Sequence, residues 1–258
     1  MTADQPPHPP VALVYGELVA AYGLSDSHRL VLEAVPDGAR VLDVGCASGY
    51  LAQRMKQHGC VVTGVEPDPE AAAAARAHCA AVFEGDIEQP DTRAALPGDQ
   101  DAVVFADVLE HLRDPLGTLT FARTLLAPGG RAVISLPNIA HWTGRRALLR
   151  GRFPYADHGL FDQTHLRFFT RASARALADD AGYSILAEHP TTAPVPLEGP
   201  LHARFGSTAE HPSAPVAALR RRLSARWPEL FALQIVLTLR PRGNVAPEPI
   251  GGPRRPGN

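Results

Sequence analysis

Short apolar runs alternate with helical patterns along the first half of the chain. The apolar runs at 39–45, 60–66, 81–86, 101–107 and 131–138 predict five buried strands. Helical patterns follow at 51–59, 69–79 and 108–130, the last closed by Pro-Gly-Gly. Because continuous apolar strands alternate with helices, we expect an α/β fold in which a parallel sheet carries helices on both faces.

The second half departs from this rhythm. Residues 139–170 are rich in histidine, arginine and aromatic side chains, and no strand–helix alternation is visible there. The pattern beyond predicts helices at 170–183 and 216–227, a sixth strand at 184–189 and a last strand at 232–240. Because we find no internal repeat and no second core, we expect one domain over 10–240. The Pro-rich ends, 1–9 and 241–258, predict a flexible N-terminal tail and a disordered C-terminal tail.

Composition narrows the classes of function. The 258 residues suit one domain, and a net charge of -2 gives no basic excess for binding nucleic acid. Lys56 is the only lysine, which excludes a mechanism that needs a second one. Three cysteines fit neither a zinc pattern nor a disulfide framework and favour reduced thiols in the cytoplasm. With no signal peptide and no run of 18 apolar residues, we expect no membrane partner.

The first strong motif runs from Asp43 through Gly45 and Ala47 to Gly49, between a predicted strand and a predicted helix. Glycine permits the tight turn and the close approach of a ligand to the backbone. The helix that follows offers free N–H groups at its N-terminus. Taken alone, this pattern also fits an ordinary glycine-containing strand–helix turn.

Acidic residues follow at the ends of the next strands. Glu66 ends the second predicted strand, 17 residues after Gly49, where a carboxylate can accept both hydroxyls of a ribose. Asp86 after the third strand can accept from an adenine amine, while Ile87 covers the ring face. Residues 105–112 close the fourth strand. In open α/β sheets ligands bind beyond the carboxyl ends of strands, so these positions predict one nucleotide site.

At this point a family resemblance is clear. VLDVGCASGYLA, VTGVEPDP, FEGDIEQ, FADVLEHL and LLAPGGRAVISLPN, within 39–138, resemble the ordered motifs of class I S-adenosylmethionine-dependent methyltransferases. LAPGG before the fifth strand and EHL after the fourth resemble the broad group that includes ubiquinone-type O-methyltransferases and methionine-biosynthesis methyltransferase-like proteins. The resemblance implies a Rossmann-like seven-stranded, mostly parallel sheet with an antiparallel last strand.

The resemblance also implies a set of residues that bind the cofactor S-adenosyl-L-methionine. Asp43 and the loop from Gly45 to Gly49 would hold the methionine part, Glu66 the ribose, and Asp86 with Ile87 the adenine. Ala47 replaces the middle glycine usual in the family, a change that a small side chain should tolerate. The full predicted set is Asp43, Gly45, Cys46, Ala47, Gly49, Glu66, Pro67, Asp86, Ile87, Ala106, Asp107 and Val108.

The chemistry of the transfer needs an in-line approach, a dry site and, for a hydroxyl acceptor, a base. We expect the acceptor pocket in an insertion at about 139–170, where the string from Asp162 to Thr170 resembles a recurrent family signature. His165, with Asp162 to orient it, and His111 are the candidates for catalytic residues. A packing role is the alternative for both histidines. The spacing predicts no metal site.

Three functions remain to be compared. The first is a methyltransferase acting on a small molecule, most simply on a hydroxyl of a sugar or secondary metabolite, with N-methylation open. The second is a non-catalytic partner protein that keeps the fold. The third is an NAD-dependent oxidoreductase, which is disfavoured because the third glycine of its fingerprint is absent and Lys56 cannot complete Tyr-x-x-x-Lys. The sequence leaves the oligomeric state open, with a homodimer as one alternative.

Overall fold

The computed structural model describes residues 23–196, 198–205, 208 and 211–243. A seven-stranded sheet with the order β3-β2-β1-β4-β5-β7-β6 crosses its centre. β7 is antiparallel to both β5 and β6, whereas the other pairs of neighbours are parallel. The strands are β1 Arg40–Val44, β2 Val61–Glu66, β3 Ala81–Glu84, β4 Gln100–Ala106, β5 Leu126–Pro137, β6 Tyr183–Pro190 and β7 Gln234–Pro241. The predicted α/β fold with its antiparallel last strand is confirmed.

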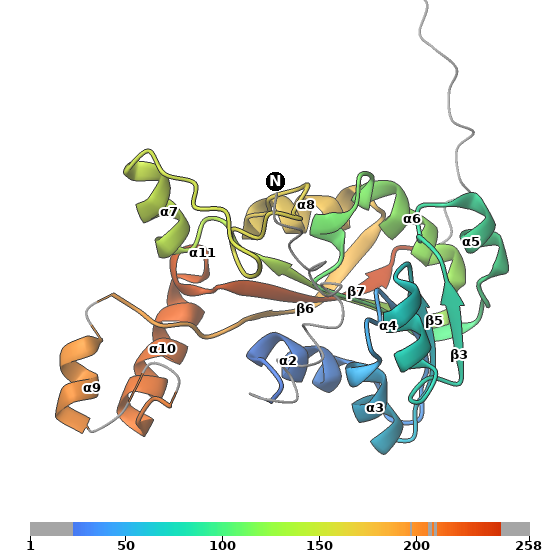
Figure 1. The fold of residues 1–258 in the computed structure, drawn as a ribbon, viewed down its shortest axis with the longest axis horizontal. Helices are drawn as coiled ribbons and strands as arrows, with labels where there is room; N and C mark the ends of the chain where they lie inside the picture. The colour runs from blue at the N-terminus through green and yellow to red at the C-terminus, as the bar shows by residue number, and fades with distance from the viewer. Residues whose placement is uncertain (1–22, 197, 206–207, 209–210, 244–258) are drawn as a thin grey trace, which may run out of the picture.

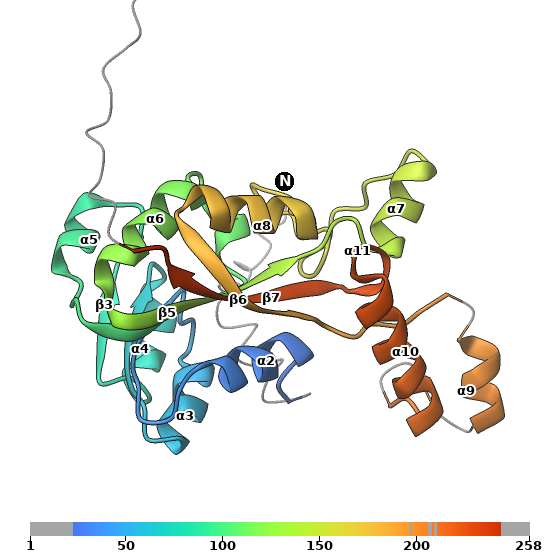
Figure 2. The ribbon, with the colours of Figure 1, turned by 180° about the vertical axis from the view of Figure 1, so that it is seen from behind.

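Helices cover both faces of this sheet, also as predicted (Figures 1 and 2). One face carries α2 (Asp26–Ala34), α3 (Tyr50–Gln57) and α4 (Pro69–Ala75). The opposite face carries α5 (Pro90–Ala95), α6 (Pro115–Leu125) and α8 (Arg171–Asp180). Beyond the carboxyl ends of β5 and β6 and the start of β7 lie α7 (Trp142–Leu149), α9 (Gly199–Phe205), α10 (Ala214–Arg226) and α11 (Pro228–Phe231).

The two faces form two apolar cores, and alternation along the strands divides the side chains between them. In β4, Val103 and Phe105 pack in the core beneath α6 and α8. Ala102 and Val104 pack in the other core, with Val31 of α2. Burial on both faces explains why these strands appear as unbroken apolar runs in the sequence.

The helix predicted within 108–130 begins later than expected, and it ends at Leu125, before the Pro-Gly-Gly that was predicted to close it. A short 3₁₀ helix, η1 (Leu109–His111), precedes α6, which begins only at Pro115. Asp114 caps α6 by accepting the N–H of Gly117 at 2.9 Å. A helix cannot continue through Pro128, which lacks an N–H, or through Gly129, whose φ is 83°. Residues 126–130 instead form the irregular start of β5, where the pairing with β4 shifts register.

Several short helices were not predicted. They are η1, α2, α5, α7, α9 and α11. In contrast, the predicted start of α8 at Thr170 is confirmed by a capping box, in which Thr170 and Ser173 bond each other's backbone N–H. The predicted C-terminal tail begins too early, because β7 runs through Pro241 and Arg242 donates its N–H to Gly182 at 2.9 Å. Residues 1–9 and 244–258 lie outside the described part of the chain.

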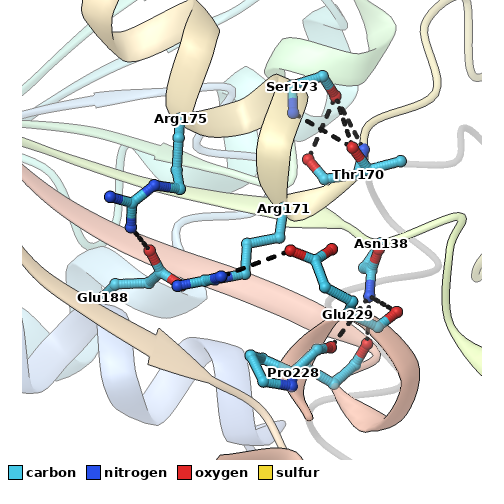
Figure 3. A network of polar contacts seen from close by, with 9 residues as sticks. Asn138, Thr170, Arg171, Ser173, Arg175, Glu188, Pro228 and Glu229 are labelled. Atoms are coloured by element: carbon cyan, nitrogen blue, oxygen red, sulfur yellow. Dashed lines mark hydrogen bonds and ion pairs between the residues drawn. The ribbon is translucent and has the colours of Figure 1, made fainter.

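A polar network ties the insertion to the end of the sheet (Figure 3). The buried amide of Asn138, just after β5, donates to the carbonyls of Pro228, Glu229 and Ala232, the last at 2.8 Å. Arg171 of α8 pairs with Glu188 of β6 and with Glu229. The segment after β5 is therefore fixed to α8 and α11. Within the described ranges no helix has the length and apolar character needed to cross a bilayer.

Candidate functional site

A cavity of about 560 Å³ opens at the carboxyl ends of β1, β2, β3 and β4. This is the position where open α/β sheets bind ligands, next to the point at which the strand order reverses between β1 and β4. The volume suits a ligand of the size of a nucleoside derivative. The residues that line it include His28, Gly45, Ala47, Tyr50, Glu66, Asp86, Ile87, Ala106, Asp107, Val108, His111, Arg113 and Thr164.

The loop after β1 is built for close approach. Gly45 has φ of 69°, and a Cβ there would lie 2.6 Å from Cγ2 of Val108. Gly49 has φ of 80° and precedes α3, where a Cβ would lie 3.1 Å from Cα of Ala75. Ala47 also takes a left-handed conformation, with φ of 49°. The sequence departure at Ala47 is therefore accommodated at the cost of a conformation that favours glycine.

Glu66 connects two strand ends. Its Oε2 accepts the N–H of Ala47 at 2.9 Å, and its Oε1 accepts the N–H of Asp68 at 3.0 Å. Burial raises the pKa of Glu66, and the two backbone donors oppose that rise. The carboxylate lines the cavity and has further lone pairs for a diol. Pro67 beside it lines the same wall.

Asp43, Cys46 and Gly49 belong to the predicted set but do not line the cavity wall. Asp43 is fully buried on β1, and burial together with the nearby Glu66 raises the pKa of Asp43 to about 7. None of the described residues bonds its Oδ2. A Cβ on Gly64 would lie 2.5 Å from Sγ of Cys46 and 3.3 Å from Sγ of Cys79. The Cys46 thiol thus packs against β2, beneath the loop.

The opposite end of the cavity is charged. Asp86 accepts the N–H of Glu88 at 2.8 Å and pairs with Arg113 at 3.2 Å. Glu88 accepts the backbone N–H groups of Arg113 and Asp114. Burial raises the pKa of Glu88, but these two bonds and the guanidinium of Arg113 outweigh burial, so the pKa is lowered. Ile87 is buried and supplies the apolar surface. The predicted pairing of an acid with an apolar side chain is present.

A second cavity of about 380 Å³ adjoins the first. Its wall comes from the start of α2, the ends of β4, β5 and β7, and the insertion. It is lined by Gly23, Leu24, Ser25, Ser27, His28, Asp107, Glu110, Pro137, His158, Gly159, Leu160, His165, Leu233 and Gln234. His28 and Asp107 are the two described residues that border both cavities.

Asp107 is held rigidly at that boundary. It has φ of 56°, and its N–H donates to Oγ of Ser135 at 2.9 Å. Its Oδ1 accepts from Oγ of Ser135 at 2.7 Å and from the amide of Gln234 at 2.8 Å. Ser135 lies on β5 and Gln234 on β7, so side chains from two strands fix this one carboxylate at the end of β4.

Of the predicted catalytic residues, His111 and His165 line the two cavities, whereas the buried Asp162 lines neither of them. The rings of His111 and His165 lie edge to face, 4.8 Å apart. His111 borders the first cavity and His165 the second. Burial lowers the pKa of His165. Asp162 does not hydrogen-bond the His165 side chain. Its Oδ1 accepts from the N–H and hydroxyl of Thr164 at 2.7 and 2.6 Å, and none of the described residues hydrogen-bonds its buried Oδ2.

Glu110 is the acidic side chain nearest to His165. Its Oε1 lies 4.0 Å from Nε2 of His165. Glu110 is buried, no described residue hydrogen-bonds its carboxyl oxygens, and burial raises its pKa well above the ordinary value. One ligand atom each from Glu110, His111 and His165 lie within 4.8 Å of one another. Such a group could hold a cation, whereas the sequence spacing predicted no metal.

Sequence reasoning missed His28, Tyr50 and Arg113 as lining residues. His28 lies on α2, and its Nε2 is 3.2 Å from Oη of Tyr50. The local signal for α2 is present, since Ser25 caps the helix and Asp26 follows in the first turn. The position of α2 over the cavity depends on its packing against β5 and β7, which no local pattern reveals.

Comparison with known proteins agrees with this geometry. The sequence model of the methyltransferase domain family matches residues 19–188, which is more than half of the chain. Solved structures share the fold. A SAM-dependent methyltransferase from Archaeoglobus fulgidus has a TM-score of 0.58 at 16% identity, over 87% of this chain and 98% of that one. Magnesium protoporphyrin IX methyltransferase from Synechocystis, with bound SAH, has a TM-score of 0.51 at 18% identity, over 89% and 80%.

Curated relatives match a shorter stretch. The ubiquinone biosynthesis O-methyltransferase of Xanthomonas campestris pv. campestris is 38% identical over 108 residues, which cover 39% of this chain and 44% of that protein. Its counterpart from Pseudomonas aeruginosa is 34% identical over 105 residues, covering 39% and 45%. The match thus spans less than half the length of these relatives. The chain belongs to the methyltransferase domain family and has the fold of class I S-adenosylmethionine-dependent methyltransferases.

Proposed function

We propose that this member of the methyltransferase domain family transfers a methyl group from S-adenosylmethionine to a hydroxyl oxygen of a small molecule. The observation that carries the proposal is the pair of adjoining cavities, which share His28 and Asp107 at their boundary. One cavity has the size and lining for the cofactor, and the other has room for an acceptor. A methyl group in transit would cross that boundary.

The residues of the first cavity fit the cofactor. Gly45 and Glu66 both line this cavity. Glycine is required at position 45 because Val108 fills the place of a Cβ, and each oxygen of the Glu66 carboxylate accepts one backbone N–H and keeps a further lone pair for a ribose hydroxyl. Asp86 and Ile87 offer an acceptor and an apolar face for the adenine. Ala106, Asp107 and Val108 line this cavity as well, and Asp107 also borders the second one. When bound, the cofactor supplies a sulfonium-activated methyl group.

The acceptor cavity favours a molecule without strong negative charge. Its described lining contains the carboxyls of Asp107 and Glu110 and no lysine or arginine. A carboxylate or phosphate would meet no cationic partner there. A neutral hydroxyl compound, such as a sugar or secondary metabolite, suits this lining. We assign to His165 and His111 the shaping of the acceptor side, and to Asp162 the anchoring of the loop through Thr164.

The finer parts of the proposal are cytoplasmic action and a small acceptor instead of nucleic acid. The net charge of -2 supports the second part. A non-catalytic partner protein is the competing function, because a retained cofactor cavity is compatible with it. The buried His28 at the boundary between the cavities favours an enzyme over a partner protein, because a non-catalytic protein has no need for a base there.

Calorimetry with the full chain tests the proposal. S-adenosylmethionine and S-adenosylhomocysteine are titrated separately, with NAD in parallel. Binding of the first two with micromolar affinity and no binding of NAD is the expected result. Binding of NAD alone would support an oxidoreductase, and binding of none would refute the cofactor assignment. A labelled methyl donor with a panel of neutral hydroxyl compounds then identifies the acceptor.

A further inference from the structure

His28 occupies the junction between the two cavities. It lies in the first turn of α2, buried, and borders both cavities together with Asp107. His111 borders only the first of them and His165 only the second. A base for methyl transfer must reach the acceptor hydroxyl while that oxygen faces the methyl carbon. Among the described histidines, His28 is the one that borders both spaces.

The surroundings of the His28 ring suit proton uptake at Nδ1. Oη of Tyr50 lies 3.2 Å from Nε2, and the two rings lie 5.1 Å apart. Nδ1 is buried, and none of the described residues hydrogen-bonds it. A neutral imidazole has one N–H and one lone pair. If Nε2 keeps its hydrogen for Tyr50, the lone pair is on Nδ1.

We propose that His28 is the general base of the transfer, accepting the acceptor's hydroxyl proton at Nδ1 while Tyr50 fixes the tautomer through Nε2. This inference rests on the proposed function. As the acceptor oxygen bonds the methyl carbon, the bond from that carbon to sulfur breaks and its electron pair stays on sulfur. The hydroxyl proton moves to Nδ1. The positive charge thus passes from the sulfonium to the imidazolium.

Electrostatics around the ring support this role. Burial lowers the pKa of His28 below its ordinary value, and the carboxylate of Asp107 opposes that effect. The ring is therefore neutral at pH 7 and able to accept a proton. Glu110, His158 and His165 face the same acceptor cavity, and Tyr50 approaches from α3. The fixed carboxylate of Asp107 would stabilise the imidazolium once it forms.

Nuclear magnetic resonance of the full chain with ¹⁵N-labelled histidine tests the proposal without an acceptor. The His28 signals are assigned by their loss in His28→Gln. At pH 7 we expect a neutral ring with hydrogen on Nε2. We then compare the His28 pKa in two complexes, one with S-adenosylhomocysteine and one with sinefungin, which carries an ammonium group near the methyl position. The pKa should be lower with sinefungin by about one pH unit, because a nearby cation disfavours the imidazolium.

Two controls make the result specific. His58 ends α3 at the side away from the cavity and pairs with Asp37 at 3.3 Å, so the ¹⁵N chemical shifts of its ring should be equal in both complexes. Tyr50→Phe should raise the fraction of hydrogen on Nδ1 of His28. Hydrogen on Nδ1 in the unmodified chain, or an equal His28 pKa in both complexes, would overturn the inference alone. Failure of both ligands to bind would overturn the proposed function and this inference with it.

Discussion

The carboxylate of Glu66, at the tip of β2, accepts the backbone N–H of Ala47 at 2.9 Å. Ala47 lies in the loop after β1, with a left-handed backbone. One acidic side chain thus holds the glycine-containing loop and also lines the cavity. Cofactor binding and loop geometry are therefore coupled at this pair, and both residues can be tested separately.

Replacing Glu66 should weaken cofactor binding. Glu66→Gln keeps the size of the side chain but removes the charge that strengthens hydrogen bonds to a ribose. Loss of these bonds costs about 1.5–3 kcal/mol, which corresponds to roughly ten- to over a hundredfold in the dissociation constant. The measurement is calorimetry with S-adenosylhomocysteine. Glu84→Gln is the matched control, because Glu84 is the register neighbour of Glu66 on β3 and lies outside the cavity lining. Equal affinity in all three proteins would contradict the assignment.

Ala47 should tolerate glycine and reject a branched side chain. A residue with φ of 49° pays about 1–2 kcal/mol unless it is glycine. Ala47→Gly removes this cost, but the more flexible unfolded chain lowers the free energy of unfolding by about 0.4–1 kcal/mol. The stability of Ala47→Gly should therefore stay close to that of the parent chain. Ala47→Val should be destabilised by at least 1 kcal/mol in urea unfolding and should bind cofactor less tightly. A stable Ala47→Val would show that the loop relaxes to another backbone conformation.

Local signals explain which parts of the fold and site could be predicted. The motifs after β1, β2, β3 and β4 couple a strand end to a helix start within a few residues, so the sequence could predict that Glu66 and Asp86 lie at one edge of the sheet, where both line the cavity. His28 was missed because α2 reaches the cavity only by packing against distant strands. Likewise, the sequence predicts that Asp162 orients His165, whereas in the fold Oδ1 of Asp162 accepts from its sequence neighbour Thr164 and its carboxylate makes no hydrogen bond to His165.

The buried carboxyl of Asp43 should make stability depend on pH. Its pKa is about 7 in the folded chain, against about 3.9 when unfolded. Because the folded value is the higher one, the contribution is fully present below pH 4 and is lost as pH rises through 7. Asp43→Asn has no carboxyl to ionise at this position. Between pH 4.5 and 7.5 its free energy of unfolding should therefore fall by a few kcal/mol less than that of the parent chain. Urea unfolding at both values measures it.

The exposed control Asp37→Asn should keep the slope of the parent chain, because its side chain is 83% exposed. The comparison is made between slopes, so an overall change in stability of Asp43→Asn does not affect it. Parallel slopes for Asp43→Asn and the parent chain would mean that the Asp43 carboxyl is ionised in the folded state throughout this range.

Ser135 should prove essential for the geometry of Asp107. Its hydroxyl accepts the N–H of Asp107 and donates to the carboxylate. Ser135→Ala leaves that N–H without its partner and the carboxylate bound by Gln234 alone, at a cost of about 1–3 kcal/mol. Ser184→Ala on β6 is the control, since Ser184 lines neither cavity. Urea unfolding should show the loss only in Ser135→Ala. If both variants match the parent chain, the left-handed backbone of Asp107 does not depend on Ser135, and the strand ends fix it by packing instead.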